Sequence, residues 1–296
     1  MTSFGQTARR WTPGADIEEV WHVIEQRVPR ADGFIQAVCD RIRLFDGELW
    51  AVMQEPSNQA RRDSYLVRYG LPVAEFAGWP GQVTDVLVDA LAAHFFWSMC
   101  WRKMDDVLDV PQPAADAIAA MATAVCRASR VHTLVCERHG LPWEDNVVGL
   151  LESLCATAAA ERRECVPRDQ IWRRATPFLI VGRTMLRLGD EQDAAFRAYI
   201  NVDGLSHDIH DLLGDVRLGI RSLPSIWFDE LDHDRAFRRD IVDRWFIRGC
   251  SELHGAIADL RRLAAVGRYP VLDVLVQRHS EAAESLGPHS RPKSAE

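Results

Sequence analysis

Residues 84–109 read TDVLVDALAAHFFWSMCWRKMDDVLD, and this stretch decides the fold class. Apolar residues recur in it at spacings of three and four, and it contains no Gly or Pro that would interrupt a helix. Pro111 and Pro113 follow it, and prolines commonly end a helix. The same spacing recurs over most of the chain, and alternating strand patterns are almost absent. The sequence therefore predicts an all-α protein.

Helical spacing predicts further helices on both sides of this segment. Their expected ranges are 16–29, 31–54, 113–138, 145–164, 167–188, 192–218, 232–265 and 270–283. Two stretches interrupt the pattern. Residues 56–63 (PSNQARRD) are interpreted as a break, and residues 70–83 (GLPVAEFAGWPGQV), with two prolines and three glycines, as a loop or a short helix.

The sequence gives no sign of a division into several domains. The 296 residues contain no long Gly/Ser-rich or Pro-rich linker and no internal repeat of fixed period. A chain of this length can bury one full core. We therefore expect a single α-helical bundle over residues 16–283, with a disordered N-terminus at 1–15 and a disordered tail at 284–296.

Composition argues against several classes of protein. The chain has 35 Lys and Arg against 43 Asp and Glu, and the net charge of −8 argues against nucleic acid as a partner. No run of about 18 uncharged apolar residues is present, so no integral membrane segment is expected, and the N-terminus lacks the apolar core of a secretory signal. Seven cysteines without a CxxC spacing indicate neither a disulfide framework nor a thiolate zinc site. A cytoplasmic location fits these features best.

Three carboxylates stand near the end of the long helix, those of Asp105, Asp106 and Asp109. Asp105 and Asp109 are four residues apart, so both lie on one helical face. Carboxylates this close repel one another, and a hard divalent cation such as Mg²⁺ is the usual compensation. The alternative is a solvated acidic helix end, although the helix dipole disfavours acidic residues there. Trp97 and Trp101 precede Asp105 on the same face, either as the wall of an apolar pocket or as ordinary core.

A second acidic cluster lies in residues 203–219, which read DGLSHDIHDLLGDVRLG. His207, Asp211 and Asp215 are spaced i, i+4, i+8 and form a stripe along one helical face. Carboxylates and an imidazole on one stripe can act as metal ligands. One DxxxD pattern arises often by chance in acidic helices, but two acidic clusters near helix ends of one all-α chain are stronger evidence for a shared metal site.

At these residues the sequence resembles the class I isoprenoid synthase superfamily, and class I terpene synthases within it. WRKMDDVLD (101–109) resembles the aspartate-rich DDxxD motif, and HDIHDLLGDVRLG (207–219) resembles the (N/D)DxxSxxxE motif. On that match His207 stands at the Asn position, Asp211 at the Ser/Thr position and Asp215 at the Glu position. The resemblance implies an all-α bundle with a central active-site cavity. It also implies that both motifs face the cavity mouth and hold three Mg²⁺ ions against a prenyl diphosphate.

A third segment, ERRECVPRDQIWRRATPF (161–178), is similar to the terpene synthase stretch in which an RRxT sequence opens a helix. The resemblance implies that Arg173 senses the diphosphate and that Thr176 is the linker residue. It also implies that Pro177 occupies the effector position, where a helix break triggers substrate ionisation. Arg174 is a further candidate for diphosphate binding, with a surface arginine as the alternative.

Two smaller sets complete the expected site. Arg268 and Tyr269 resemble the RY pair that hydrogen-bonds the diphosphate in this family. The allylic carbocation left by the departing diphosphate must be kept from water, so the cavity is expected to be apolar and closed. The candidate lining residues are Phe96, Trp97, Trp101 and Phe178.

The second motif also resembles squalene/phytoene synthases. Their pattern is a DxxxD, here Asp211 and Asp215 followed by GIRSLP (219–224), with an Arg three residues before the first aspartate pair, here Arg102. The tyrosine- and glycine-rich segment that this family carries between its motifs has no match. The long region before the DDxxD is more similar to that of a cyclase.

The resemblance therefore implies a Mg²⁺-dependent terpene synthase, a carbon–oxygen lyase acting on phosphates. Its expected substrate is a linear prenyl diphosphate, farnesyl or geranylgeranyl diphosphate, and a homodimer is an open possibility. Two alternatives stay open, a prenyl-condensing transferase of the squalene/phytoene type and a non-catalytic helical protein that binds isoprenoids. The sequence contains no GxGxxG or GxxxxGK[ST] phosphate loop and no GxSxG or HExxH hydrolase motif.

Overall fold

The computed structural model describes residues 17–108, 112–142, 148, 152, 176–218, 239–263 and 269–285. Every regular element in these parts of the chain is a helix and none is a strand, which confirms the all-α prediction. Apart from two positions, the predicted helix at 145–164 lies outside the described residues. The segment 1–15, expected to be disordered, also lies outside them. The tail was expected to be disordered from residue 284, but Glu284 and Ser285 belong to the last helix, and residues 286–296 lie outside the described residues.

The helices follow one another along the chain, and one of them, η1, is a single π-helical turn. Their bounds are α2 (Ile17–Arg27), α3 (Ala31–Phe45), α4 (Gly47–Met53), α5 (Pro56–Tyr65), η1 (Leu66–Gly70), α6 (Leu71–Phe76), α7 (Asp85–Leu108), α8 (Ala115–His139), α10 (Thr176–Thr184), α11 (Asp190–Leu218), α13 (Arg239–Leu263) and α14 (Pro270–Ser285).

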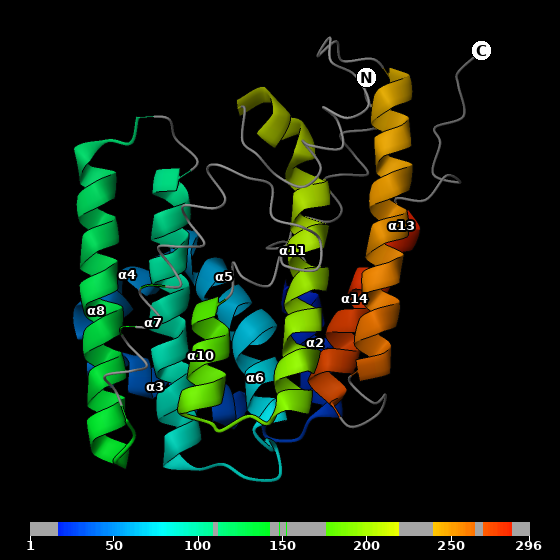
Figure 1. Cartoon of the computed structure of the whole chain (residues 1–296). Coiled ribbons are helices and arrows are strands. Elements are labelled where there is room, and N and C mark those ends of the chain that lie inside the picture. The colour runs from blue at the N-terminus through cyan, green and yellow to red at the C-terminus, as the bar shows by residue number, and fades with distance from the viewer. Residues whose placement is uncertain are drawn as a thin grey trace.

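The bundle has two halves, built around α7 and α11 (Figure 1). α7 packs against α8, α3 and α10, whereas α11 packs against α13, α10 and α14. α7 and α8 are antiparallel neighbours. Because α10 contacts both α7 and α11, it joins the two halves.

Two sequence predictions in the N-terminal part are wrong. The segment 31–54 forms two helices, because Asp46 is extended and its carboxylate caps α4 by accepting the Leu49 amide at 2.9 Å. Residues 56–63 belong to α5, because Pro56 stands in its first turn, where the fixed φ of proline favours a helix. The short helix allowed for within 70–83 is present as α6, and α7, α8, α11 and α14 lie close to their predicted bounds.

Residues 87–100 of α7 are buried on every face of the helix. Phe95, Phe96 and Trp97 are among the largest fully buried side chains of the described chain. A helix that is apolar all round is stable only when neighbours cover it on every side. The central position of α7, between α3, α8 and α10, follows from this composition.

Asp89 is the charged residue in this buried stretch. Its carboxylate is fully buried and is paired with Arg41, with Arg138 at 3.2 Å and with His139 Nε2 at 2.8 Å. These partners belong to α3 and α8, so one carboxylate of α7 connects three helices. Several donors are needed because the desolvation of a buried carboxylate is costly when nothing compensates it.

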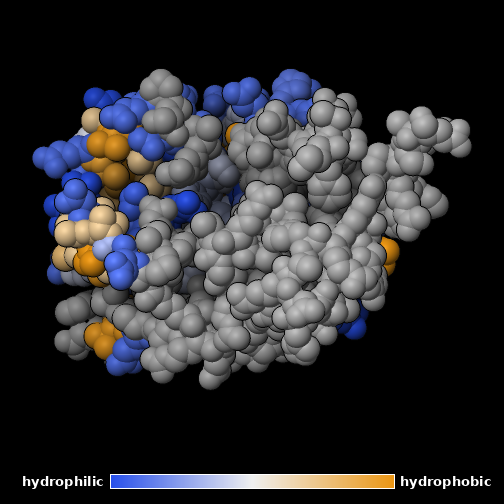
Figure 2. All heavy atoms as spheres, turned by 90° about the horizontal axis from the view of Figure 1, so that it is seen from above, coloured by the Kyte–Doolittle hydropathy of each residue, from blue (hydrophilic) through white to orange (hydrophobic). Residues whose placement is uncertain are grey.

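The surface around the end of the bundle where α7 and α11 finish is seen in Figure 2. Hydrophilic side chains predominate over the coloured part of this view, with smaller apolar areas on the side of α8. None of the described helices has both the length and the apolar character that spanning a bilayer requires.

Glu75 of α6 ties this short helix to the C-terminal helix. Its two carboxylate oxygens accept the amides of Val271 at 2.7 Å and Leu272 at 2.9 Å, in the first turn of α14. Glu75 is 3% exposed. Burial raises the pKa of Glu75 to about 8, although the two amide hydrogen bonds oppose the shift.

Glu75 predicts a pH dependence of stability. Its pKa rises from an ordinary 4.5 to about 8 on folding, so the folded state holds this proton more tightly than the unfolded state. The resulting stabilisation is complete below pH 4.5 and is lost as the pH rises through about 8. The loss is at most about 1.4 kcal/mol for each pH unit. We expect urea unfolding to show wild type losing stability over this range relative to Glu75→Gln.

The matched control for this comparison is Glu281→Gln. Glu281 lies on the exposed side of α14, with 48% of its side chain exposed, and its replacement should leave the pH slope of wild type unchanged. Equal slopes for wild type and Glu75→Gln would contradict the prediction, because they would show that the two α14 amides keep Glu75 ionised in the folded state.

Candidate functional site

The two acidic segments lie at one end of the bundle. α7 and α11 run in the same direction, and their C-terminal ends are at the top of Figure 1. Asp105 and Asp106 fall in the last turn of α7, and Asp211 and Asp215 in the last two turns of α11. The side chains of these four residues, and the whole of Asp109, lie outside the described residues. The backbone thus carries both segments to the same side of the molecule.

The third predicted segment lies only partly within the described chain. Arg173 and Arg174 are outside it. Thr176, Pro177 and Phe178 form the start of α10, and their side chains lie outside the described residues. In Figure 1 α10 runs antiparallel to α7 and α11, so its N-terminus is directed toward the end where the acidic segments lie. The N-terminus of a helix carries partial positive charge and favours anions.

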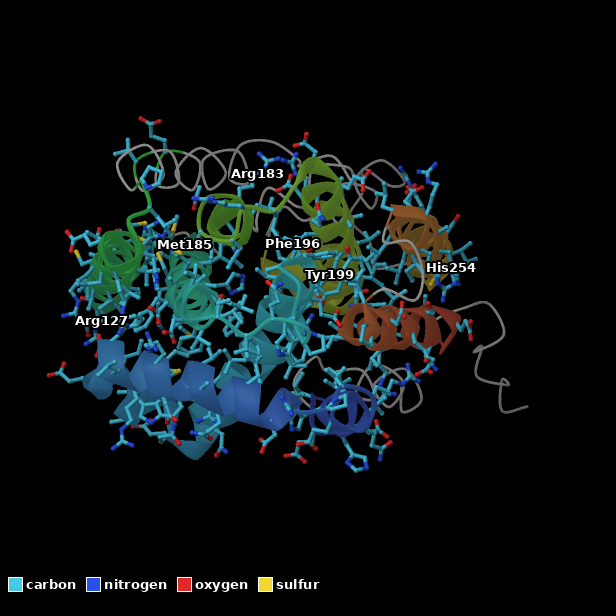
Figure 3. All side chains as sticks on the ribbon, turned by 90° about the horizontal axis from the view of Figure 1, so that it is seen from below. Arg127, Arg183, Met185, Phe196, Tyr199 and His254 are labelled. Atoms are coloured by element: carbon cyan, nitrogen blue, oxygen red, sulfur yellow. The ribbon has the colours of Figure 1, made fainter. Side chains whose placement is uncertain are left out.

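Tyr269 does not lie with the acidic segments. Its ring packs edge-on against Phe76, with ring centroids 4.7 Å apart, and Phe76 packs against Phe196 at 6.0 Å. Phe196 is in the N-terminal part of α11 and points into the interior (Figure 3). It precedes Asp211 by about 22 Å along the helix axis. The structure therefore separates Tyr269 from the second acidic segment, and Arg268 lies outside the described residues.

The predicted lining residues differ in burial. Phe96 and Trp97 are 1% and 0% exposed, and the Trp97 indole donates a hydrogen bond to His132 Nδ1 at 3.2 Å. Burial lowers the pKa of His132 to about 4, so the ring is neutral and can accept this bond. Phe96 and Trp97 are thus core residues. Trp101, one turn closer to the acidic end of α7, is only partly buried and can still face a cavity.

A buried polar cluster lies on α11 directly before the second acidic segment. We name Arg68, Tyr69, Asp203, His207 and His279 the Arg68 cluster. The Arg68 NH2 group donates to Asp203 Oδ1 and lies 2.6 Å from His207 Nε2. The Tyr69 hydroxyl donates to Asp203 Oδ2 at 2.7 Å, and His279 Nε2 lies 3.5 Å from Asp203 Oδ1. The cluster therefore joins η1, α11 and α14.

The charges of the cluster centre on Asp203. Burial alone would raise the pKa of Asp203, but the adjacent Arg68 guanidinium, with a hydrogen bond from His279, holds that pKa well below its ordinary value. Burial disfavours a charged Arg68, yet Asp203 beside it raises its pKa. Both partners therefore stay ionised. Since the guanidinium can only donate, His207 Nε2 is the acceptor in their contact, and the proton of a neutral His207 ring is on Nδ1.

η1 carries Arg68 to α11 by a local widening of the helix. The amide of Leu71 bonds to the carbonyl of Leu66, five residues back, so the chain makes one π-helical turn between α5 and α6. Leu66, Val67, Arg68 and Gly70 are all buried in this turn. Single π-helical turns occur often at functional sites, where they change the direction of side chains.

Sequence reasoning missed most of the Arg68 cluster. Asp203 continues the four-residue spacing of His207, Asp211 and Asp215 toward the N-terminus, and this spacing was a usable signal. Arg68 gave no signal, because it stands in no motif and its partner Asp203 is 135 residues away.

The predicted metal site fits Mg²⁺ in part. The aspartates of both acidic segments offer carboxylate oxygens, the ligands that this ion prefers. His207 does not fit, because its Nε2 lone pair accepts a hydrogen bond from Arg68 and a guanidinium 2.6 Å away repels a second cation. Among the described side chains, no group of three or more His, Cys, Asp and Glu could hold a metal ion. The carboxylates of the two acidic segments are not among those side chains.

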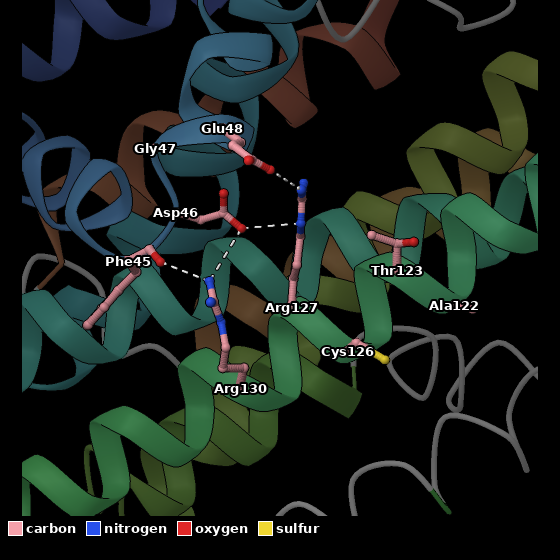
Figure 4. A pocket seen from close by; sticks show the side chains of 9 residues that line it. All are labelled: Phe45, Asp46, Gly47, Glu48, Ala122, Thr123, Cys126, Arg127 and Arg130. Atoms are coloured by element: carbon pink, nitrogen blue, oxygen red, sulfur yellow. Dashed lines mark hydrogen bonds and ion pairs between the residues drawn. The ribbon is translucent and has the colours of Figure 1, made fainter.

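One open cleft lies away from these elements, between the α3–α4 junction and α8 (Figure 4). Its volume is about 670 Å³. Asp46 Oδ2 lies 3.2 Å from Arg127 and 3.6 Å from Arg130, and Glu48 lies 3.4 Å from Arg127. Two carboxylates thus neutralise the two guanidinium groups that line the cleft, so these residues give it no excess charge for an ionic ligand.

Comparison with known proteins does not identify the chain. No family model matches the sequence, and no curated protein matches it significantly. The chemistry of the site is therefore argued from the residues of this chain.

The Arg68–Asp203 pair predicts that stability depends on both partners. Arg68→Met leaves the Asp203 carboxylate buried without its cation, and Asp203→Asn leaves the guanidinium without its anion. Each change should lower the free energy of unfolding by about 3–5 kcal/mol. The double variant should be less destabilised than the sum of the two single changes, because it strands neither charge. Urea unfolding of the four proteins measures this coupling.

Arg262→Met is the control for this cycle. Arg262 pairs with Asp259 at 3.0 Å, but their side chains are 75% and 49% exposed. Its loss should change the free energy of unfolding by less than about 0.5 kcal/mol. Strictly additive effects of Arg68→Met and Asp203→Asn would contradict the buried pair.

Proposed function

We propose that this chain is a Mg²⁺-dependent class I terpene synthase, a carbon–oxygen lyase that ionises a linear prenyl diphosphate. One observation carries the proposal. In an all-helical bundle, α7 and α11 bring two acidic segments, far apart in the sequence, to the same end (Figure 1). Carboxylates gathered in this way repel one another, and a divalent cation bound between them removes the repulsion.

The residues proposed to hold Mg²⁺ are the aspartates of the two helix ends. They are Asp105, Asp106 and Asp109 on the α7 side, and Asp211 and Asp215 on α11. Bound Mg²⁺ would neutralise charge on the diphosphate oxygens as the C–O bond breaks. His207 is left out of this set because Arg68 occupies its Nε2.

The start of α10 supports binding of the diphosphate from a second side. The N-terminus of this helix is directed toward the acidic end of the bundle, and its partial positive charge favours an anion. Arg173, three residues before Thr176, can add planar N–H donors that fit phosphate oxygens. In this proposal Thr176 and Pro177 connect Arg173 to α10.

An ionised prenyl chain also needs apolar surroundings that exclude water. Trp101 is partly buried and precedes Asp105 by one helical turn on the same face of α7. Its indole can therefore cover the first carbons of a chain whose diphosphate lies against Asp105, and an aromatic face stabilises a cation. Phe178 at the start of α10 is the second proposed lining residue.

The proposal predicts that both acidic segments are needed for activity. Asp105→Asn and Asp215→Asn each remove one carboxylate from the proposed Mg²⁺ set. Each should slow release of diphosphate from farnesyl diphosphate by at least about 100-fold, because stabilisation of the leaving group is lost. A coupled assay for diphosphate, with gas chromatography of the organic product, measures both halves of the reaction. Asp116→Asn, at an exposed position of the first turn of α8, should keep wild-type activity.

The outcome of the same assay separates the alternatives. A product with the same carbon count as the substrate supports a terpene synthase, whereas a doubled count supports a condensing enzyme of the squalene/phytoene type. Wild-type protein that releases no diphosphate from ten-, fifteen- or twenty-carbon substrates in Mg²⁺ would contradict the proposed activity and favour a non-catalytic isoprenoid-binding protein.

A further inference from the structure

The Arg68 cluster holds more hydrogen-bond donors than acceptors. One nitrogen of the guanidinium, NH2, makes the contacts of Arg68 to Asp203 and to His207. The Nε and NH1 groups bond to neither Asp203 nor His207, and 10% of the side chain stays exposed. The buried hydroxyl of Tyr199, four residues before Asp203 on α11, is a further hydrogen-bond partner of the guanidinium. These partners do not use all five N–H donors of Arg68, so the exposed edge of the guanidinium can bind a further acceptor.

The position of Arg68 indicates where that acceptor lies. Asp203, His207, Asp211 and Asp215 follow one another on α11 at intervals of four residues, about 6 Å of helix axis each. Arg68 contacts the first two of them. The next two belong to the acidic segment proposed to hold Mg²⁺. The guanidinium thus stands one to two helical turns from the proposed diphosphate site.

We infer that Arg68 is a diphosphate-binding residue of this site, and that its guanidinium takes the place of the metal ion expected at His207. The inference rests on the proposed function. A guanidinium offers planar pairs of N–H donors that match phosphate oxygens, and Arg68 has such donors to spare. Asp203 and His207 are positioning residues, which hold the guanidinium without touching the diphosphate.

A fixed guanidinium differs from a bound metal ion in a measurable way. Its positive charge is present at every Mg²⁺ concentration, because Asp203 holds it in the folded protein. His207 should then have no direct part in Mg²⁺ binding. Its contribution should be to the affinity for diphosphate, through the orientation of Arg68.

The test is binding of inorganic diphosphate to the full chain in Mg²⁺, measured by isothermal titration calorimetry. The variant Arg68→Met/Asp203→Asn removes the guanidinium without stranding a buried charge. We expect it to bind diphosphate at least about tenfold more weakly than wild type, which corresponds to the loss of one charged hydrogen-bonded contact. Wild-type affinity in this variant would overturn the inference.

A matched control exists at the other end of α11. Arg183 of α10 (Figure 3) donates from Nε to Asp193 at 2.7 Å, and Asp193 is a buried carboxylate in the first turn of α11. Arg183→Met/Asp193→Asn makes the same chemical change away from the acidic segments. It should bind diphosphate within about twofold of wild type. An equal loss of binding in both double variants would overturn the inference, because it would show a general effect of removing an arginine–aspartate pair that α11 makes with another helix.

The variant His207→Gln tests whether His207 positions Arg68, as inferred, or binds a metal ion directly. Gln keeps an acceptor for Arg68 but changes its position, so diphosphate should bind somewhat more weakly at an unchanged half-saturating Mg²⁺ concentration. A tenfold or larger rise in that Mg²⁺ concentration would show that His207 is a metal ligand and would overturn the inference.

The outcomes distinguish this inference from the proposed function. Loss of diphosphate binding in Asp215→Asn, with wild-type binding in Arg68→Met/Asp203→Asn, overturns the inference alone. No binding of diphosphate by wild type at any Mg²⁺ concentration overturns both. Where the Arg68 double variant lacks a cooperative unfolding transition, Arg68→Lys takes its place, because it keeps the charge and loses the planar pair of donors. It should bind at least about threefold more weakly, and wild-type affinity overturns the inference.

Discussion

The ion pair between Arg68 and Asp203 lies where η1, α11 and α14 meet, and both of its charges are out of water. Such a pair is stable only when its geometry is good and further hydrogen bonds satisfy the carboxylate, because desolvation of either charge alone is costly. Tyr69 and His279 supply those contacts from two other elements. α11 therefore cannot slide or rotate against η1 without leaving a charge unpaired. This constraint fixes the direction in which the acidic stripe of α11 points.

Two buried carboxylates of α11, those of Asp193 and Asp203, are each bound by an arginine from another element. Asp193 in the first turn is bound by Arg183 of α10, and Asp203 in the middle is bound by Arg68 of η1. The acidic level at the C-terminal end is different in kind, because α7 also ends on this side of the molecule and carries aspartates of its own. In the proposed function, a divalent cation bound among these carboxylates relieves their repulsion.

The sequence predicted the features that depend on local spacing. α7 was predictable because a long, mostly apolar run with helical spacing and no Gly or Pro is typical of a buried helix. The acidic stripe of α11 was predictable because four-residue spacing defines a helical face. The break between α3 and α4 at Asp46 was not predictable, because one capping aspartate inside an apolar pattern looks like any other helical residue. The role of Arg68 in the cluster could not be predicted for another reason. Its contacts are set by how distant helices pack, which spacing along one helix does not report.

His207 shows how these two kinds of information fit together. By resemblance it departs from the Asn of the terpene synthase motif, and taken alone that departure weakens the proposed metal site. The contact with Arg68 gives this departure a physical reason. Nε2 of a histidine lies farther from the helix axis than the end of an Asn side chain, so it can accept a hydrogen bond from the Arg68 guanidinium, at 2.6 Å. In the proposed function, the departure in α11 and the arginine in η1 form one arrangement, in which an interhelical hydrogen bond takes the place of a metal–ligand bond. In such a site the Arg68 guanidinium would supply part of the positive charge permanently, and Mg²⁺ would supply only the remaining charge.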